Sequence, residues 1–381
     1  MNIESLVTYK RLKKWFLRKT PTSGVRRVGP VFSAVASDIG IGREENQDRA
    51  ALVRSVDCEG KPYTLVLISD GMGGMKDGGV CAAIAMAAFL SSFFIRSKTR
   101  SKHSEWLSGA ALDANRVIFD QYLGRGGATL SVLLFRSDGS GGILNIGDTR
   151  VYGCDGSSLM QLTVDDTLAG QLGDKLGALK GRNELLQFVG MGVDLDPHYL
   201  SFMPSGLKSF VLTTDGVHYL NNELMRDLIV NAEDVGVAAR RLVEVAKWCG
   251  GRDNCSSVIV SVEPSIGSIL TDDLDSDLYE IWDSFGDLQI SCEIAAQDKP
   301  EKFFADVKKI LGLNSDAELV QKKTVKEKKN LTTKSRRNYG GGKKLGGRRD
   351  VEVEKKSSDG DSDELKENSM PQLKMSFPSK E

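Results

Sequence analysis

The sequence predicts an α+β domain built from antiparallel sheets, and three observations lead to this class. Segments rich in Val, Ile, Leu, Thr and aromatic residues recur along the chain, each bounded by Gly, Asp or Ser, as β-strands commonly are. Those between residues 128 and 155 follow one another through glycine-rich turns such as 137–142, which favours hairpins. A few helical segments are grouped between the strands, and this arrangement is typical of α+β layering.

The strand segments are bounded by turn residues and the helical segments by their apolar spacing. The helix at 105–123, for example, has apolar residues such as Leu107, Ala111, Ala114 and Ile118 along one face. In chain order, we expect strands at 31–37, 49–55, 63–69, 128–135, 142–147, 149–155, 209–214 and 256–262, and helices at 79–96, 105–123, 221–231 and 235–248.

The helix at 79–96 contains the longest apolar run of the chain, residues 80–95. This run is too short to span a bilayer comfortably, is rich in Ala, and is interrupted by Ser91 and Ser92. We therefore expect a buried helix lying on a sheet, and no transmembrane segment.

The length of 381 residues suits one large domain with appendages, or two domains. Inside the expected domain, residues 165–205 lack a regular pattern, which is typical of a functional flap. The tail is rich in Lys, Ser, Gly and Glu and has few large apolar residues, so we expect it to be disordered. The predicted organisation is a basic N-terminal arm (1–30), a compact domain (31–263), an acidic linker with a short helix at 300–312 (264–320) and a disordered charged tail (321–381).

The net charge of −1 hides three charged blocks, a basic one at 10–27, an acidic one at 272–287 and a basic one at 322–349. The first block includes Trp15 and Phe16, so it is compatible with binding to an anionic membrane surface or to a protein partner. A solvated arm that binds nothing is the alternative interpretation. The positive charge of the last block is compatible with binding to the phosphates of a nucleic acid. Tethering of a protein partner, or simple solubilisation, is the favoured interpretation, and we do not expect nucleic acid as a partner.

The six cysteines are scattered, no two have CxxC spacing, and no secretory signal precedes them. We interpret them as reduced thiols of a cytoplasmic protein, not as a disulfide framework or a zinc site. Cys249 and Cys255 flank Asp253, and we interpret both as small apolar fillers. With three histidines in the chain, a His-rich metal site is not expected.

Acidic residues recur where strands begin or end. Asp70 follows a buried strand in "LISDGMGG", and taken alone it is well explained as a turn residue. Four further acids occupy similar places, and turns alone explain five such acids poorly. These are Asp48, Asp148, Asp215 and Asp253.

Carboxylates that are buried near one another repel and need a metal ion or a proton to neutralise them. Ligand sets made only of oxygen favour Mg²⁺ or Mn²⁺ over zinc. A glycine beside a ligating Asp, such as Gly71, lets the backbone approach and offer its carbonyl. Two such ions side by side hold a hydroxide and clamp a phosphoryl group.

The motifs around these acids follow a recognisable order: "GREENQDR", "ISDGMGG", "GATLSVLLF…LNIGDTRVY", "LTVDDT", "QFVGMG", "LTTDGV" and "RDNCSSVIV". In this order and spacing the chain resembles the PPM, or type 2C, metal-dependent protein Ser/Thr phosphatases, and bacterial members in particular. The resemblance covers about residues 31–263. It implies a four-layer α-β-β-α sandwich of two antiparallel sheets flanked by helices, and two Mn²⁺ or Mg²⁺ ions with a third, weaker one.

The resemblance also implies a role for each matching residue. Asp70 would bridge two metals, the Gly71 carbonyl would bind one, and Asp215 and Asp253 would complete the first site. Asp48 would serve the second metal, and Asp148 with Asp215 the third. Arg43 would bind the phosphate and, with Asp48 and Asp70, counts among the catalytic residues. The implied reaction is single-step hydrolysis by a metal-bridging hydroxide.

Three positions depart from the family pattern. Gln47 stands where many members have an acid, Met72 where some carry a histidine proposed as general acid, and Tyr219 where some carry an acid for the third metal. Simpler interpretations stay open for two of the site residues. Asp148 is also explained as a β-turn acid that holds the Arg150 region. Arg43 is also explained as a member of a plain surface salt bridge.

The residues and the resemblance together predict a cytoplasmic phosphatase that acts on phosphoserine and phosphothreonine in proteins and opposes a bacterial Ser/Thr kinase. The alternative is a non-catalytic scaffold or regulatory module of the same fold that acts through its charged tails. A regulator associated with nucleic acid is a third hypothesis. His218 lies near the predicted site, and we expect it to be a hydrogen-bonded, partly buried residue and not a ligand.

Overall fold

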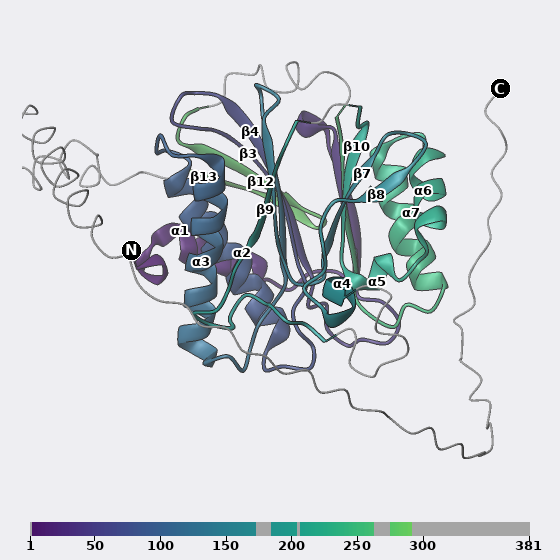
Figure 1. Cartoon of the computed structure of the whole chain (residues 1–381), viewed down its shortest axis with the longest axis horizontal. Coiled ribbons are helices and arrows are strands. Elements are labelled where there is room, and N and C mark those ends of the chain that lie inside the picture. Colours follow the sequence, from purple (N-terminus) through teal and green to yellow (C-terminus); the bar gives the residue numbers. More distant parts are fainter. Residues whose placement is uncertain (1, 173–183, 204–205, 263–274, 292–381) are drawn as a thin grey trace, which may run out of the picture. The chain divides into compact units, whose positions relative to one another are not determined.

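Two antiparallel sheets lie face to face, and helices cover the outer face of each sheet (Figure 1). The computed structural model describes residues 2–172, 184–203, 206–262 and 275–291, and these belong to one compact unit. The expected helix at 300–312 and the tail at 321–381 lie outside the described residues. The predicted four-layer α-β-β-α sandwich is confirmed.

The first sheet has the strand order β1-β2-β11-β10-β7-β8, and the second has the order β13-β12-β3-β4-β5-β6-β9. Every neighbouring pair is antiparallel. The strands of the first sheet are β1 Ser23–Val28, β2 Ser33–Asp38, β7 Arg150–Cys154, β8 Leu159–Gln161, β10 Ser209–Thr213 and β11 Cys255–Ser261. Those of the second are β3 Arg49–Val56, β4 Pro62–Ser69, β5 Leu130–Arg136, β6 Gly141–Ile146, β9 His198–Phe202, β12 Leu278–Asp283 and β13 Gly286–Ser291.

The helices fall into two groups, one for each sheet (Figure 1). Those packed with the second sheet are α1 Val7–Phe16, α2 Gly78–Arg96 and α3 His103–Tyr122, preceded by the short 3-10 helix Ile3–Ser5. Those packed with the first sheet are α5 Asp215–His218, α6 Asn222–Val230 and α7 Val235–Trp248. The short α4 Leu168–Leu172 and the 3-10 helix Gly29–Val31 lie in connections.

Three hydrophobic cores result, one between the sheets and one under each layer of helices. Residues 65–68 of strand β4 are all apolar because both faces of the strand are covered. Leu65 and Leu67 face the helices, whereas Val66 and Ile68 face the other sheet. Successive side chains of a strand point to opposite faces, and both faces of β4 are buried.

Helix α2 is the expected core helix. It is long and apolar enough to cross a membrane by length and composition, but 89% of its most apolar window is buried inside the domain. The eight predicted strands and four predicted helices are all present, with bounds within about two residues of those expected.

The expectation of an N-terminal arm at 1–30 is wrong, because this segment is part of the domain. Tyr9, Leu12 and Phe16 are buried, and they share one face of α1, which packs against α2. The lysines of the block occupy the other positions of the helix. Strand β1 then pairs with β2, with Val25 opposite Ala36.

The acidic block, which lies inside the expected linker at 264–320, is also folded where the structure describes it. Residues 278–291 form the hairpin β12–β13, and β12 extends the second sheet beside β3, with Ile281 opposite Val53. Tyr279 is buried and stacks on Phe94, with ring centroids 3.8 Å apart. Buried residues alternate with half-buried ones along β12, so one face of this strand is covered more fully than the other.

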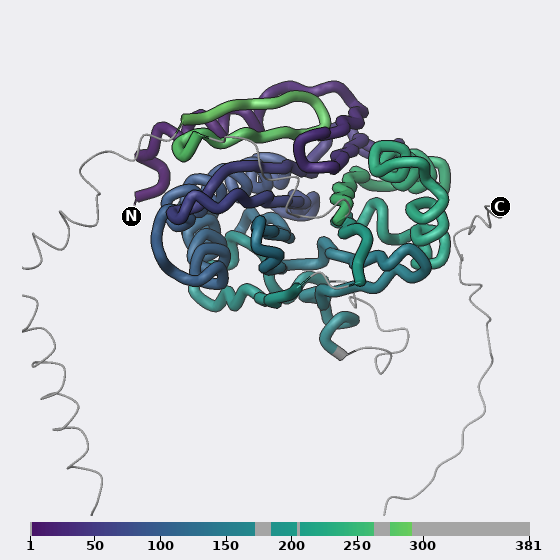
Figure 2. The backbone as a smooth tube through the Cα atoms, turned by 90° about the horizontal axis from the view of Figure 1, so that it is seen from above, coloured from purple at the N-terminus to yellow at the C-terminus, as the bar shows by residue number. Residues whose placement is uncertain are grey.

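The N-terminal segment and the β12–β13 hairpin lie side by side (Figure 2), and two arginines of the first basic block pair with acids of the hairpin. Arg18 Nη2 lies 2.6 Å from Asp283 Oδ2 and stacks on the ring of Trp15, with 3.5 Å between the guanidinium carbon and the ring centroid. Arg26 Nη1 lies 3.2 Å from Asp287 Oδ1. Attraction between opposite charges therefore joins the N-terminal segment to the hairpin, although the paired residues are 261 and 265 positions apart in the sequence.

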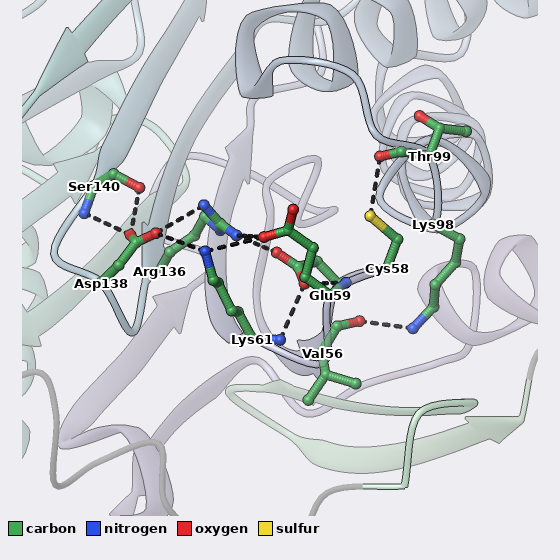
Figure 3. A network of polar contacts seen from close by, with 10 residues as sticks. Val56, Cys58, Glu59, Lys61, Lys98, Thr99, Arg136, Asp138 and Ser140 are labelled. Carbon is green, nitrogen blue, oxygen red and sulfur yellow. Dashed lines mark hydrogen bonds and ion pairs between the residues drawn. The ribbon is translucent and has the colours of Figure 1, made fainter.

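A second polar network lies at the end of the second sheet where β3 turns into β4 and β5 turns into β6 (Figure 3). Arg136 Nη1 donates to Asp138 Oδ2 at 2.9 Å, and the Lys98 ammonium donates to the Val56 carbonyl at 2.6 Å. Lys61 pairs with Glu59 in the turn between β3 and β4. The Lys98 contact ties the end of β3 to the end of α2, and ion pairs of Arg136 with Asp57 and of Lys61 with Asp138 join the two hairpin turns to each other.

We expect Leu12→Ala to lower the free energy of unfolding by about 2–5 kcal/mol, because Leu12 is fully buried where α1 packs on α2. Val7→Ala, at an exposed position of the same helix, should change it by less than about 0.5 kcal/mol. Urea denaturation measures both values. Equal small effects would show that α1 does not pack on the domain in solution.

Candidate active site

The five strand-end acids gather at one end of the two sheets, and the strand register explains this. Arg49 pairs with Ser69, so Asp48 before β3 and Asp70 after β4 lie at the same end of the second sheet. In the first sheet, Thr213 pairs with both Arg150 and Ser257. The same end of that sheet therefore carries Asp148, Asp215 and Asp253.

The acids act on one another electrostatically, and Asp70 is the centre of the group. Burial raises the pKa of Asp70 well above its usual range, and the charges of Asp48, Asp215, Asp148 and Asp253 raise it further. Burial also raises the pKa of Asp148 to about 7, with the charge of Asp215 adding to the effect. The pKa of Asp215 is raised by burial and by Asp253. The structure thus brings all five predicted acids together.

Asp48 is the most enclosed of these carboxylates, with 3% of its surface exposed. Its Oδ2 accepts a hydrogen bond of 2.9 Å from the Thr214 hydroxyl, which itself accepts from the Ser256 amide at 3.0 Å. Burial raises the pKa of Asp48 to about 7, and Asp215 and Asp253 add to this. The Oδ1 atoms of Asp48 and Asp215 are buried and have no hydrogen-bond partner in the described structure.

Gly71 stands where no other residue fits. A Cβ atom at this position would lie 2.3 Å from the Gly78 carbonyl oxygen, so the turn closes only with glycine. The Asp70 amide donates to the Thr129 hydroxyl, and the Thr129 amide donates to the Asp70 carbonyl, both at 2.9 Å. These two bonds fix the backbone on either side of the Asp70 carboxylate.

Arg43 is the cation that faces the acids. Its Nη2 lies 2.6 Å from Asp253 Oδ2, and Asp70 and Asp215 also raise the pKa of the guanidinium, after the larger effect of the Asp253 hydrogen bond. The simpler interpretation predicted a surface ion pair. An ion pair does form, but its partner is one of the candidate metal ligands. About 40% of the Arg43 side chain remains exposed.

Asn254 holds the segment that carries Arg43, and our sequence analysis assigned it no role. Its Oδ1 accepts from the Gln47 amide at 2.8 Å, and its Nδ2 donates to the carbonyl oxygens of Ile39 at 2.8 Å and Glu45 at 2.9 Å. The sequence feature that could have pointed to Asn254 is its position directly after Asp253 in "RDNCSSVIV".

Arg49 supports the same segment from the other side. Its Nη1 donates to the carbonyl oxygens of Asn46 at 2.8 Å and Asp48 at 2.7 Å, and its Nε donates to the Phe16 carbonyl at 2.7 Å. The end of α1 is therefore bonded to the backbone beside Asp48. Nothing in the sequence pattern pointed to this contact, because the partners are backbone oxygens.

The turn that carries Asp148 is tied to the segment predicted as a flap. Asp166 is buried; its Oδ2 accepts from the Gly147 amide at 2.9 Å, and its Oδ1 lies 2.8 Å from His198 Nε2. Arg150 forms three hydrogen bonds with Asp165, the shortest 2.7 Å. Burial raises the pKa of Asp148 and the charge of Arg150 partly offsets this, so Arg150 also acts on Asp148, as the turn-acid interpretation expects. Residues 173–183 of the predicted flap lie outside the described structure.

Two residues that follow Asp215 in the sequence have hydrogen-bond partners other than the acids. His218 Nδ1 lies 3.0 Å from the Thr213 hydroxyl, and burial lowers the pKa of His218 well below its usual range. This agrees with the expected hydrogen-bonded histidine. The Tyr219 hydroxyl donates to the Ala246 carbonyl, so this hydroxyl is bonded to the backbone of α7.

The sequence of the chain is similar to the sequences of named bacterial protein phosphatases. No protein-family model matches it. It is 26% identical over 243 residues to protein phosphatase PhpP of Streptococcus pneumoniae, which covers 60% of this chain and 96% of PhpP. It is 27% identical over 241 residues to the Ser/Thr protein phosphatase PstP of Mycobacterium tuberculosis, covering 60% of this chain and 44% of PstP.

Solved structures add the fold. The crystal structure of the Ser/Thr phosphatase Stp1 from Staphylococcus aureus matches with a TM-score of 0.54 at 20% identity, over 61% of this chain and 95% of that one. The crystal structure of a bacterial serine phosphatase matches with a TM-score of 0.55 at 21% identity, over 61% and 97%.

The chain is a homologue of the bacterial PPM-type Ser/Thr phosphatases. The resemblance read from the motifs is thereby confirmed, as is the fold that it implied. The roles of the individual site residues stay predictions.

The residues of this PPM homologue fit divalent cations in their donor chemistry. The acids supply only oxygen atoms, two buried Oδ1 atoms have no partner, and the raised pKa values mark carboxylates that a nearby positive charge would stabilise. Among the described residues, no three Asp, Glu, His or Cys side chains stand in an arrangement that could hold a metal ion as it is. The donor chemistry therefore identifies candidate ligands, but the described side chains do not define a coordination geometry.

The raised pKa of Asp48 predicts a pH dependence of stability in the presence of a chelator. The folded protein holds this proton up to about pH 7, whereas the unfolded chain releases it near pH 4. The contribution of Asp48 to the free energy of unfolding should therefore fall as pH rises between these values. Asp48→Asn lacks this group and should gain on the order of 1–3 kcal/mol relative to wild type over that range.

Urea denaturation across this pH range measures the difference between the two proteins. Addition of Mn²⁺ at the upper pH should stabilise the wild type more than Asp48→Asn. A difference that stays constant with pH would mean that the Asp48 carboxylate is not held in a desolvated, repulsive setting.

Proposed function

We propose that this PPM homologue is a metal-dependent enzyme that hydrolyses phosphoserine and phosphothreonine in proteins. One observation carries the proposal: five acids from five strand ends share one electrostatic cluster with an exposed guanidinium at its edge. The relatives named Ser/Thr protein phosphatase support the substrate class. A phosphate ester needs positive charge on its oxygens and a water placed behind phosphorus, and this cluster suits both.

The ions would be Mn²⁺ or Mg²⁺. Asp70, Asp215 and Asp253, with the Gly71 carbonyl, would hold the first, and Asp48 with Asp70 the second. Asp148 with Asp215 would hold a third, weaker ion. When bound, such ions neutralise the phosphoryl oxygens and lower the pKa of water so that it attacks phosphorus. The protein's part is to hold these carboxylates together on stiff strand ends.

Arg43 would bind the phosphate directly. Its guanidinium already stands at the cluster through Asp253, and a planar fork of donors matches two phosphate oxygens. Asn254 and Arg49 are positioning residues in this proposal, because they bond the backbone between Ile39 and Asp48. Met72 carries a thioether and donates no proton, so the leaving alcohol would take its proton from water.

We further infer a cytoplasmic location and phosphoprotein substrates made by a Ser/Thr kinase that this enzyme opposes. In the part of the chain that is described, the cysteines are free, which agrees with a reducing compartment. A tail-mediated protein partner is compatible with the basic residues 322–349, which lie outside the described structure. The scaffold alternative gains no support from the described residues, because the whole set of acids is retained.

We expect Asp70→Asn and Asp253→Asn each to reduce hydrolysis of a phosphopeptide about 100-fold or more, because each removes a charge that would hold the ions. Released inorganic phosphate is measured with Mn²⁺ present. Asp155→Asn is the matched control. Asp155 is an exposed acid after β7, at the opposite end of that strand from Asp148, and it should keep wild-type activity.

Metal binding provides an independent readout. Titration calorimetry with Mn²⁺ should show weaker binding in both site variants and unchanged binding in Asp155→Asn. The proposal fails if purified wild type hydrolyses no phosphopeptide with Mn²⁺ and the site variants bind the ion as wild type does.

A further inference from the structure

Two large apolar side chains lie exposed beside Arg43 and Asp253. Ile41 is 68% exposed and precedes Arg43 by two residues, and Trp248 is 77% exposed and ends α7 five residues before Asp253. Single exposed apolar residues are common, but tryptophan is seldom left in water and is frequent where proteins bind partners. Their shared place at the rim of the candidate active site therefore calls for a function.

Backbone contacts hold the two residues at the same rim. The Ile41 amide donates to the Gly251 carbonyl at 2.7 Å, and a Cβ atom on Gly251 would lie 3.1 Å from Ile41 Cγ1. The side chain of Ile41 thus lies against the turn that leads from Trp248 to Asp253. In that turn, Gly250 and Gly251 have positive φ angles of 143° and 51°, which favour glycine.

The rim is firmly attached to the domain. Lys247 Nζ lies 2.9 Å from Asp38 Oδ2, and the Gly251 amide donates to the Ala246 carbonyl at 3.2 Å. The Tyr219 hydroxyl donates to the same Ala246 carbonyl. A surface fixed in this way binds a partner without having to become ordered first.

We propose that Ile41 and Trp248 form a docking surface for an apolar side chain that flanks the phosphorylated residue of a substrate protein. This rests on the proposed function and names a feature of its substrates. With the phosphate at Arg43, an extended peptide advances about 3.3 Å per residue. Ile41 and Arg43 are two residues apart, so the apolar side chain would stand one to three positions from the phosphorylated residue.

The size and charge of the rim favour this occupant. Two side chains offer far less than the roughly 1,200–2,000 Å² that a stable protein–protein interface buries, so a second copy of the chain is a poorer match. An anionic membrane would have to approach the cluster of five carboxylates. A phosphopeptide brings one phosphate to Arg43, and Arg252, an exposed cation, stands at the same rim.

Three substrates test the proposal: p-nitrophenyl phosphate, a phosphopeptide with Leu two positions from the phosphothreonine, and the same peptide with Gly there. Trp248→Ala and Ile41→Ala should each raise KM for the Leu peptide about fivefold or more, with kcat little changed. The Gly peptide and p-nitrophenyl phosphate should be hydrolysed as by wild type. Met160→Ala, at an exposed apolar position on β8, is the matched control and should change none of the three.

Each other outcome counts against the proposal. An unchanged KM for the Leu peptide, or an equal rise for both peptides, would overturn it. So would a Trp248→Ala protein that differs from wild type only in oligomeric state or in binding to anionic vesicles. If wild type hydrolyses neither p-nitrophenyl phosphate nor either phosphopeptide with Mn²⁺, and the site variants bind the ion as wild type does, the proposed function itself fails. Normal hydrolysis of that ester with no peptide selectivity removes only the docking surface.

Discussion

The mutual repulsion of five carboxylates at one end of the sandwich is the constraint on which the other features of the site depend. Burial and neighbouring acids raise the pKa of Asp48 and Asp148 to about 7 and that of Asp70 well above its usual range. Groups that repel in this way stay together only if the surrounding structure is stiff. Paired strands supply that stiffness, because Asp70 and Asp215 follow β4 and β10, which are buried on both faces.

The two ends of the described chain contribute to this stiffness. The N-terminal helix and the β12–β13 hairpin are joined by Arg18 and Asp283, and the Phe16 carbonyl accepts from Arg49, which also bonds the backbone beside Asp48. Charges of opposite sign, far apart in the sequence, thus meet next to the candidate site. Arg18 and Arg26 of the basic block at 10–27 thus have structural partners in the acidic hairpin.

Most of the sandwich was predictable from the sequence because its strands and helices carry strong local patterns. Asp70 and Asp215 were predictable as a pair for the same reason, since each ends an apolar run before glycine. The N-terminal helix was missed because its buried residues, such as Tyr9 and Leu12, are diluted by lysines that point outward. Asn254 and Arg49 were missed because their partners are backbone atoms, which leave no pattern in a sequence.

The central claim is that the acids around Asp70 hold divalent cations. The most direct measurement is a crystal structure of the protein grown with Mn²⁺, with anomalous diffraction recorded to locate the ion. The account predicts anomalous peaks within bonding distance of Asp70, about 2.0–2.6 Å for hard oxygen ligands, and none in Asp70→Asn crystals. Wild-type crystals without a peak near Asp70, at Mn²⁺ concentrations that support phosphate release, would contradict it.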